Sequence, residues 1–157
     1  MKIISHRGNI SGPNPSTENH PDTIDTALSM GFDVEIDIRY DRFCDNFYLG
    51  HDEPQYSVTR YWLAQRKEKL WIHCKDIEAL YEFAHCTGGY NYFWHQTDDF
   101  TLTSKKYIWT YPGKSYTSQS VIVMPESYTD EKHFRDLIAY NCYGICTDYP
   151  QRLKDEN

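Results

Sequence analysis

The feature that most constrains the fold is the segment Asp-Val-Glu-Ile-Asp-Ile at residues 33–38, in which acidic and apolar side chains alternate. Side chains of a β-strand project to opposite faces in turn, so Asp33, Glu35 and Asp37 share one face and three β-branched residues share the other. Carboxylates that share a site repel one another, and a bound divalent cation relieves this repulsion. The segment therefore predicts a strand with a cation site on one of its faces.

The same alternation occurs on the solvent-facing side of antiparallel sheets, and this alternative stays open for the segment taken alone. The preceding residues 22–30 have the apolar spacing of a helix, and Gly31 is suited to end it. A strand that follows such a helix is normally part of a parallel sheet with both faces covered. Carboxylates on the inner face of a covered sheet indicate a functional site, and we interpret the segment in this way.

Five other short motifs accompany the acidic strand. They are Ser5-His6-Arg7-Gly8, Glu18-Asn19, His51-Asp52, Ile-His-Cys-Lys at residues 72–75 and Gly-Ile-Cys-Thr-Asp-Tyr-Pro at residues 144–150. Together with residues 31–37, and in this order, they resemble the glycerophosphodiester phosphodiesterase family from residue 3 to about residue 153. The resemblance implies a barrel fold and the cleavage of a phosphodiester.

The resemblance also implies a metal site. In that family a divalent ion is held by a glutamate after the first strand, two acidic residues on the second and a glutamate on the third. Glu18, Glu35 and Asp37 match three of these positions, whereas His73 stands at the fourth. Imidazole ligates Mn²⁺ or Zn²⁺ but is a poor ligand for Ca²⁺ or Mg²⁺. The identity of the ion and the direct participation of His73 are therefore left open.

The catalytic residues implied by the resemblance are His6 and His51. Histidine suits proton transfer because its pKa lies near neutrality, so one ring can be charged while the other is neutral. Arg7 and Lys75 are the implied phosphate-binding cations, and with the metal they would stabilise charge on the phosphoryl oxygens. The sequence does not assign which histidine is the acid and which is the base.

Eight segments have the composition of strands. They are residues 2–6, 33–39, 70–75, 90–94, 101–103, 107–111, 120–124 and 144–148. Helices are predicted at residues 22–30, 57–66, 77–86 and 131–141, and a hairpin at residues 44–46 leads to His51. The middle strands are closely spaced, and a full barrel usually takes ~200 residues or more. The predicted fold class is therefore α/β, a reduced TIM (β/α)₈ barrel with several middle helices missing; an open seven-stranded sheet is the alternative.

Side chains at the carboxyl ends of the strands are expected to converge, because active sites of such barrels form there. His73 and Lys75 share one face of their strand with Trp71. Four ring-bearing residues near other strand ends are candidates for a wall of the same site: Trp94, His95, Trp109 and Tyr111. Of these, Trp109 is the expected substrate contact. For Trp94, Trp109 and Tyr111 alike, a ring-filled core that compensates for the missing helices is the alternative. The remaining histidines are expected at the surface or on helices: His20, His85 and His133.

Composition limits the class of protein and of partner. The 157 residues, 39% hydrophobic and 25% charged, are typical of one globular domain spanning residues 1–157. A net charge of −7 argues against nucleic acid and anionic membranes as partners. No apolar run approaches the ~20 residues of a membrane span, and the first residues do not resemble a signal peptide. Five cysteines without zinc-type spacing indicate a reduced, cytoplasmic chain.

The sequence thus predicts a metal-dependent phosphodiesterase that acts by histidine general acid–base catalysis. The expected substrate is a small-molecule or glycan-linked phosphodiester, and the expected cofactor is Mg²⁺, Ca²⁺ or Mn²⁺. The alternative is a non-catalytic barrel that binds phosphorylated ligands. The sequence leaves the oligomeric state open.

Overall fold

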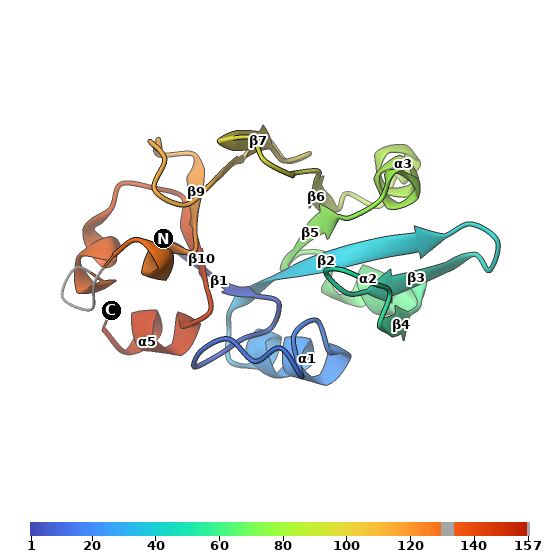
Figure 1. The fold of residues 1–157 in the computed structure, drawn as a ribbon, viewed down its shortest axis with the longest axis horizontal. Coiled ribbons are helices and arrows are strands. Elements are labelled where there is room, and N and C mark those ends of the chain that lie inside the picture. The colour runs from blue at the N-terminus through green and yellow to red at the C-terminus, as the bar shows by residue number, and fades with distance from the viewer. Residues whose placement is uncertain (130–133, 157) are drawn as a thin grey trace.

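The computed structural model describes residues 1–129 and 134–156 and shows a mixed α/β chain built on one curled sheet (Figure 1). Its strands are β1 (Lys2–His6), β2 (Asp33–Asp41), β3 (Asn46–Leu49), β4 (Tyr56–Val58), β5 (Leu70–Cys74), β6 (Asn91–Phe93), β7 (Phe100–Leu102), β8 (Ile108–Thr110), β9 (Ser120–Val123) and β10 (Gly144–Thr147). Its helices are α1 (Pro21–Ser29), α2 (Arg60–Arg66), α3 (Ile77–His85) and α5 (Pro150–Asp155), with the 3₁₀ helices η1 (Pro125–Ser127) and η2 (Arg135–Ala139). Among the described residues, no helix is long and apolar enough to cross a bilayer.

Eight strands follow one another around the curled sheet in the order β6-β5-β2-β1-β10-β9-β8-β7. β1 is parallel to both of its neighbours, with His6 opposite Glu35 on β2 and Ile4 opposite Cys146 on β10. β3 pairs antiparallel with the end of β2 and continues into β4 as a hairpin outside this series. The eight strands coincide with the eight predicted segments, and the reduced barrel is confirmed.

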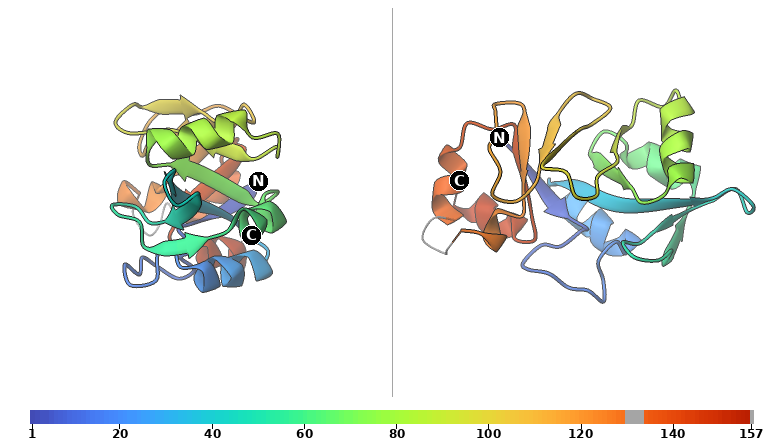
Figure 2. Two further views of the ribbon diagram at one scale, coloured as in Figure 1. Left: turned by 90° about the vertical axis from the view of Figure 1, so that its right-hand side faces the viewer. Right: turned by 45° about the horizontal axis from the view of Figure 1, so that its top comes forward.

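The middle of the chain forms strands without helices, as predicted. No helix lies between residues 86 and 124, a stretch that the structure describes throughout (Figures 1 and 2). β7 nevertheless runs antiparallel to β8, whereas the strands of a complete barrel are all parallel. Only residues 103–107 join the two strands, and a parallel connection needs about a dozen residues or more. A hairpin is therefore the pairing that this short connection permits.

The circle of strand pairs is interrupted between β6 and β7, where the described residues form no ladder. Hydrogen bonds between residues 90–94 and residues 101–104 bridge the gap instead. The Ser104 amide donates to the Tyr92 carbonyl at 2.8 Å, the Tyr92 amide donates to the Ser104 hydroxyl at 3.0 Å, and the Thr101 hydroxyl donates to the Trp94 carbonyl at 2.8 Å. We refer to this irregular contact as the β6–β7 seam.

Strand alternation sorts the apolar side chains into an interior core and outer cores. The interior core consists of Ile4, Trp71, Phe93, Trp109, Val121, Val123 and Cys146. On the outer side of β2, Val34 and Ile36 belong to a core that also contains Ile24 of α1. On the outer side of β9 and β10, Ile122 and Ile145 pack with residues of η2 and α5. The opposite face of β2, which carries the carboxylates, therefore points into the barrel.

Two helix boundaries differ from those predicted. The helix predicted from residue 57 begins at Arg60, because residues 56–58 pair with β3 and Thr59 caps the helix by accepting the Trp62 amide. Within the helix predicted over residues 131–141, the described residues form a 3₁₀ helix at Arg135–Ala139. Residues 131–133, including His133, lie outside the described residues. Helix α5 has no counterpart among the predicted helices, although Pro150 suits the first turn of a helix.

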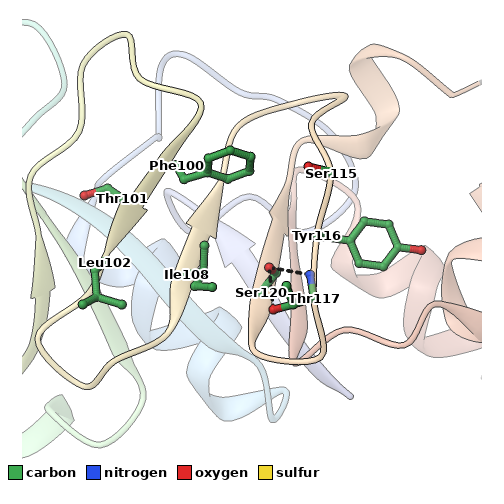
Figure 3. A pocket seen from close by; sticks show the side chains of 8 residues that line it. All are labelled: Phe100, Thr101, Leu102, Ile108, Ser115, Tyr116, Thr117 and Ser120. Carbon is green, nitrogen blue, oxygen red and sulfur yellow. Dashed lines mark hydrogen bonds between the residues drawn. The ribbon is translucent and has the colours of Figure 1, made fainter.

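The absence of helices over residues 86–124 leaves the outer face of β7 and β8 open to solvent. The side chains of Phe100 and Leu102 are 44% and 64% exposed. With Ile108 and Tyr116 they line a groove on this outer face (Figure 3). The groove is apolar and is separate from the barrel interior.

Candidate active site

One cavity of about 430 Å³ opens where the carboxyl ends of the strands meet. Six of the residues that line it are the predicted catalytic, metal-binding or phosphate-binding residues His6, Arg7, Glu35, His51, His73 and Lys75. These residues come from β1, β2, β5 and the loop after β3. The structure therefore brings distant segments together at the expected end of the barrel.

Three of the four carboxylates of β2, those of Asp33, Glu35 and Asp37, point into the barrel at different depths. Asp33 lies at the amino end, where it accepts hydrogen bonds from Lys2 at 3.0 Å and from the Trp71 indole at 3.2 Å. Glu35 and Asp37 follow toward the carboxyl end, since each strand residue advances the chain by about 3.3 Å. Only these two carboxylates of the strand reach the site, and both are buried.

Glu35 and Asp37 have opposite electrostatic environments although they are neighbours on one face. Burial and the adjacent charge of Asp37 raise the pKa of the Glu35 carboxyl above its ordinary value. Burial also opposes ionisation of Asp37, but the adjacent His73 ring and the Arg7 and Lys75 cations outweigh it and hold the pKa of Asp37 well below its usual range. Asp37 is therefore the permanent anion of the pair, and Glu35 is the carboxylate most in need of a cation.

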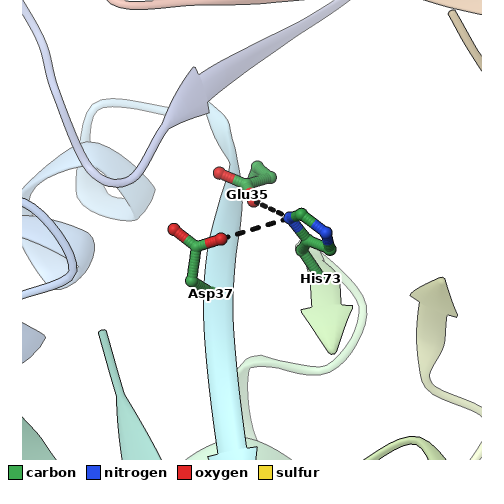
Figure 4. Close-up of side chains that lie close together, drawn as sticks. All are labelled: Glu35, Asp37 and His73. Carbon is green, nitrogen blue, oxygen red and sulfur yellow. Dashed lines mark ion pairs between the residues drawn. The ribbon is translucent and has the colours of Figure 1, made fainter. Parts of the chain in front are cut away.

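His73 presents its Nδ1 atom to both carboxylates (Figure 4). Its Nε2 lies 2.9 Å from the backbone carbonyl of His95, which can only accept a hydrogen bond, so Nε2 carries the proton. In the neutral ring Nδ1 then bears a lone pair, at 3.2 Å from Asp37 Oδ1 and 3.8 Å from Glu35 Oε1. A lone pair facing two carboxylates is unfavourable unless a proton or a metal ion lies between them.

The donor atoms of this Glu35/Asp37/His73 cluster fit a divalent ion. They all lie within 4.8 Å of one another, and adjacent ligands of an ion with bonds of about 2.1 Å are about 3 Å apart. Oδ1 of Asp37 is buried and has no hydrogen-bond donor among the described residues. An orphaned carboxylate oxygen beside an imidazole lone pair is the chemistry of a metal-ligand set.

The charges around the cluster also favour a divalent ion. The carboxylates are Glu18, Glu35, Asp37 and Asp148, and the permanent cations are Arg7 and Lys75. Four negative groups against two positive groups leave a formal charge of −2 when the histidines are neutral. A divalent cation would neutralise this excess.

Arg7 and Asn19 hold Asp37 from the other side. The Arg7 Nε lies 2.9 Å from Asp37 Oδ2, and its Nη1 donates to Glu18 at 3.0 Å. Asn19 donates to Asp37 Oδ2 at 3.0 Å and accepts the Asp37 amide at 2.9 Å. Both Arg7 and Asn19 adopt left-handed backbone conformations, with φ of 53° and 60°. Such strain persists where surrounding contacts fix it, as these hydrogen bonds do.

Glu18 does not join the cluster formed by Glu35, Asp37 and His73. Its carboxylate instead binds Arg7 through one oxygen and the Asn9 amide, at 3.1 Å, through the other. The structure therefore places this predicted ligand beside the site, as a partner of the guanidinium.

His6 forms a pair with Asp148, a buried residue that follows β10. Its Nδ1 lies 2.8 Å from Asp148 Oδ1, and its Nε2 faces Glu35 at 4.0 Å. Burial opposes protonation of His6, but the hydrogen bond to Asp148 and the charge of Glu35 outweigh it and raise the pKa of His6 above its ordinary value. A carboxylate can only accept, so Nδ1 carries a proton and Nε2 is the atom that can take up another. The arrangement is that of a histidine oriented to act as a base.

His51 is presented by a fixed loop after β3. Arg39 donates to the backbone carbonyls of His51 at 2.7 Å and Asp52 at 2.9 Å. The loop begins at Gly50, whose φ of +146° is a conformation that favours glycine. A side chain is also excluded there, because a Cβ atom on residue 50 would lie only 2.1 Å from the Glu53 carbonyl oxygen. The His51 ring pairs with Asp52 at 2.7 Å, and its side chain is 40% exposed. The second histidine therefore meets the cavity from its solvent side.

The aromatic candidates divide between the two faces of the sheet. Trp109 is 5% exposed and belongs to the interior core, as the alternative of a ring-filled core implies. It also lines the cavity, as expected of a residue in the wall of the site. Tyr111 and His95 line the cavity as well. Trp94 packs on the outer core, so its expected place in the wall is wrong. The cause is strand alternation, because Phe93 and His95 on either side of it point inward.

Four polar residues that hold the site have no assigned role in the sequence-based prediction: Asn9, Asn19, Glu126 and Asp148. Asn9 donates to Asp148 Oδ1 at 2.7 Å, and Glu126 accepts the Asp148 amide at 2.8 Å. Asp148 is recognisable as a residue at a strand end, but its partner lies 142 residues away. The two asparagines follow no periodic pattern that would have marked them.

Comparisons with known proteins bear on the fold. No protein-family model and no curated protein matches the sequence. The structure is similar to the crystal structure of glycerophosphodiester phosphodiesterase from Agrobacterium tumefaciens str. C58, with a TM-score of 0.60, 14% sequence identity and coverage of 99% of this chain and 98% of that chain. A likeness at this identity shows the fold, and the resemblance predicted from the sequence motifs is confirmed at that level.

Proposed function

We propose that the protein is a metal-dependent phosphodiesterase that cleaves a glycerophosphodiester or a related phosphodiester. The observation that carries the proposal is one cavity lined by His6, Glu35 and His73. His6 is paired with Asp148 behind the lining, and the other two residues form the cluster with Asp37. The pair supplies proton transfer and the cluster supplies a site for a divalent cation. A protein that only binds phosphate has no need of an oriented base beside the cation site.

The two histidines would divide the proton transfers. Nε2 of His6 takes the proton from the attacking oxygen, that of water or of a neighbouring substrate hydroxyl, as this oxygen forms a bond to phosphorus. Asp148 stabilises the imidazolium that results, as a carboxylate does in a serine–histidine–aspartate triad. His51 gives a proton to the departing alkoxide as the second P–O bond breaks. Its position on the solvent side suits a leaving group that diffuses out.

Charge on the phosphoryl group would be stabilised by Arg7, Lys75 and a metal ion. Glu35, Asp37 and His73 would hold the ion, which supplies Lewis-acid stabilisation of a phosphoryl oxygen when bound. Glu18 can join these ligands only if its ion pair with Arg7 opens, and this would free the guanidinium for the phosphate. Lys75 lies 3.8 Å from Asp37 Oδ1 and is available to a second phosphoryl oxygen.

The remainder of the cavity suggests where the alcohol would bind. Trp109, Tyr111, Val123 and Met124 form the aromatic and apolar part of its lining. This apolar wall suits the carbon skeleton of a small or glycan-linked alcohol. All five cysteines are free, which supports action in a reducing compartment such as the cytoplasm.

Hydrolysis of defined substrates tests the proposal. Purified protein is stripped of metal and assayed with bis-p-nitrophenyl phosphate and glycerophosphocholine, each with added Mn²⁺, Mg²⁺ or Ca²⁺. We expect turnover of the diesters only with metal, and none of the monoester p-nitrophenyl phosphate. Asp37→Asn should abolish the metal-dependent rate. Asp41→Asn is the matched control, because it makes the same change at the far end of the same strand, outside the lining of the cavity.

Two results would count against the proposal. Turnover that survives metal removal or Asp37→Asn would show that the cluster is not the reaction centre. Metal binding without turnover of any diester would favour the alternative of a non-catalytic barrel that binds phosphorylated ligands.

A further inference from the structure

We propose that the Glu35/Asp37/His73 cluster selects a first-row transition-metal ion of the Mn²⁺ to Zn²⁺ series over Ca²⁺ and Mg²⁺. The inference deepens the proposed function and rests on it only for the location of the metal. The selectivity itself follows from the donor atoms that the described residues offer.

The nitrogen donor of the cluster is fixed before any ion binds. The Nε2–H of His73 is held by the His95 carbonyl at 2.9 Å, and the ring stacks on Phe93 with centroids 5.0 Å apart and planes at 10°. Both contacts orient Nδ1 toward the carboxylates. A histidine that donates its other nitrogen to a carbonyl is the usual arrangement around protein-bound metals, and it raises the basicity of the ligand.

The carbonyl that orients His73 is itself held in place. The His95 ring donates from Nε2 to the Asp98 carbonyl, which closes residues 95–98 into a tight loop. At the base of this loop, the Thr101 hydroxyl donates to the Trp94 carbonyl at 2.8 Å as part of the β6–β7 seam. The imidazole nitrogen is thus a preorganised ligand, and preorganised imidazole suits Zn²⁺, Fe²⁺ or Co²⁺ better than it suits an ion that prefers oxygen.

The oxygen donors that Ca²⁺ would require are committed elsewhere. Ca²⁺ takes about six to eight oxygen ligands. Glu18 is bound to Arg7 and Asn9, and Asp148 is bound to His6 and Asn9. Within the part of the chain that the structure describes, only Glu35 and Asp37 remain as carboxylates directed at His73. A site with two carboxylates and one imidazole fits a smaller, nitrogen-accepting ion.

Isothermal titration calorimetry on the full chain tests the selectivity, with CoCl₂, MnCl₂, CaCl₂ and MgCl₂ as titrants. Cys44 and Cys86 are exposed thiols that would bind Zn²⁺ or Co²⁺, so both are replaced by serine in every protein titrated, and Zn²⁺ is omitted. The otherwise wild-type protein should bind Co²⁺ and Mn²⁺ on the order of 100-fold more tightly than Ca²⁺ or Mg²⁺. His73→Glu should weaken Co²⁺ binding by about 10- to 100-fold, the usual cost of disturbing a metal-ligand set, and should strengthen Ca²⁺ binding. The matched control is His85→Glu, the same change at an exposed helical residue, which should leave every affinity unchanged.

The visible spectrum of bound Co²⁺ gives a second measurement that needs no variant to fold, since its ligand-field bands report nitrogen coordination. Equal affinity of wild-type protein for Ca²⁺ and Co²⁺ would overturn the proposal, as would a bound-Co²⁺ spectrum of oxygen ligands alone. An unchanged order of affinities in folded His73→Glu would also overturn it. Metal binding is measured without substrate, so it tests the metal selectivity independently of the reaction. A failure of turnover would refute the proposed reaction alone.

Discussion

Replacing Asp148 with asparagine isolates the electrostatic part of the His6–Asp148 pair. Both His6 Nδ1, at 2.8 Å, and Asn9 Nδ2, at 2.7 Å, point at Oδ1 of Asp148. The amide oxygen of an asparagine can occupy the same position and accept the same two hydrogen bonds. The variant therefore keeps the geometry and removes the negative charge.

The expected loss follows from the value of that charge. A hydrogen bond to a charged partner contributes about 1.5–3 kcal/mol, and each 1.4 kcal/mol of barrier is about tenfold in rate. Asp148→Asn should therefore lower kcat/KM by about 10- to 150-fold. Because Asp148 is a main cause of the raised pKa of His6, the variant should also move the acidic limb of the pH–rate profile to lower pH.

Asp52→Asn is the internal comparison for this experiment. It also removes the carboxylate of a histidine–aspartate pair, but the Asp52 side chain is 90% exposed whereas that of Asp148 is 5% exposed. Solvent screens an exposed pair, so the loss at Asp52 should stay below about fivefold. Both rates are measured against bis-p-nitrophenyl phosphate over a range of pH, beside melting temperature and metal affinity. A stable Asp148→Asn protein that loses no more activity than Asp52→Asn would refute the assignment of His6 as the supported base.

Three further predictions concern the histidines and the loop that presents one of them. Alanine at His6 or at His51 should lower turnover by a factor on the order of 10²–10⁴. The double variant should be scarcely slower than the slower single variant, because both histidines act in one transition state. Initial rates and melting temperatures of the three proteins check this. Since the fold raises the pKa of His6, its protonation stabilises the native state fully below the ordinary pKa of 6.5, and this stabilisation is lost as the pH rises through the folded-state pKa. Urea unfolding without metal therefore measures the free energy of unfolding of wild type and of His6→Gln over a range of pH. The excess stability of wild type should fall as the pH rises above about 6.5, and an excess that rises would contradict the shift. Gly50→Ala should lower the stability by on the order of 1–3 kcal/mol and remove much of the activity, because the added Cβ would lie 2.1 Å from the Glu53 carbonyl oxygen. Thermal unfolding and kinetics measure the two effects. Wild-type stability and activity in this variant would mean that the loop does not position His51.

The part of the site that lies on long strands follows from the sequence. The alternation on β2 and β5 assigns Glu35, Asp37 and His73 to inward faces, and the rule for parallel barrels places their ends together. Periodicity has less power on short strands. β6 has only three residues, Asn91–Phe93, too few for alternation to assign the face of Trp94 just beyond its end. The sequence-based prediction places Trp94 on the wrong face of the sheet for this reason.

The contacts between loops and strand ends do not follow from periodicity. Asn9 and Asn19 hold Asp148 and Asp37 through loop geometry, and nothing in their spacing identifies those partners. The direction of β7 is another such case, since its sequence indicates a strand but only the length of the connection to β8 decides how it pairs. Local patterns thus predict elements and faces, whereas loop closure decides partners.

The ladder between β1 and β10 joins the first strand of the chain to the last, and this has a consequence for biosynthesis. Contacts between residues so distant in sequence form late, because closing a long loop costs entropy before the contact repays it. A nascent chain that has emerged only through β9 already contains Glu35, Asp37 and His73. It lacks Asp148, the partner of His6. A stalled or truncated polypeptide of this kind would hold the proposed metal ligands without the supported base, and proton transfer would begin only once the final strand had docked beside the first.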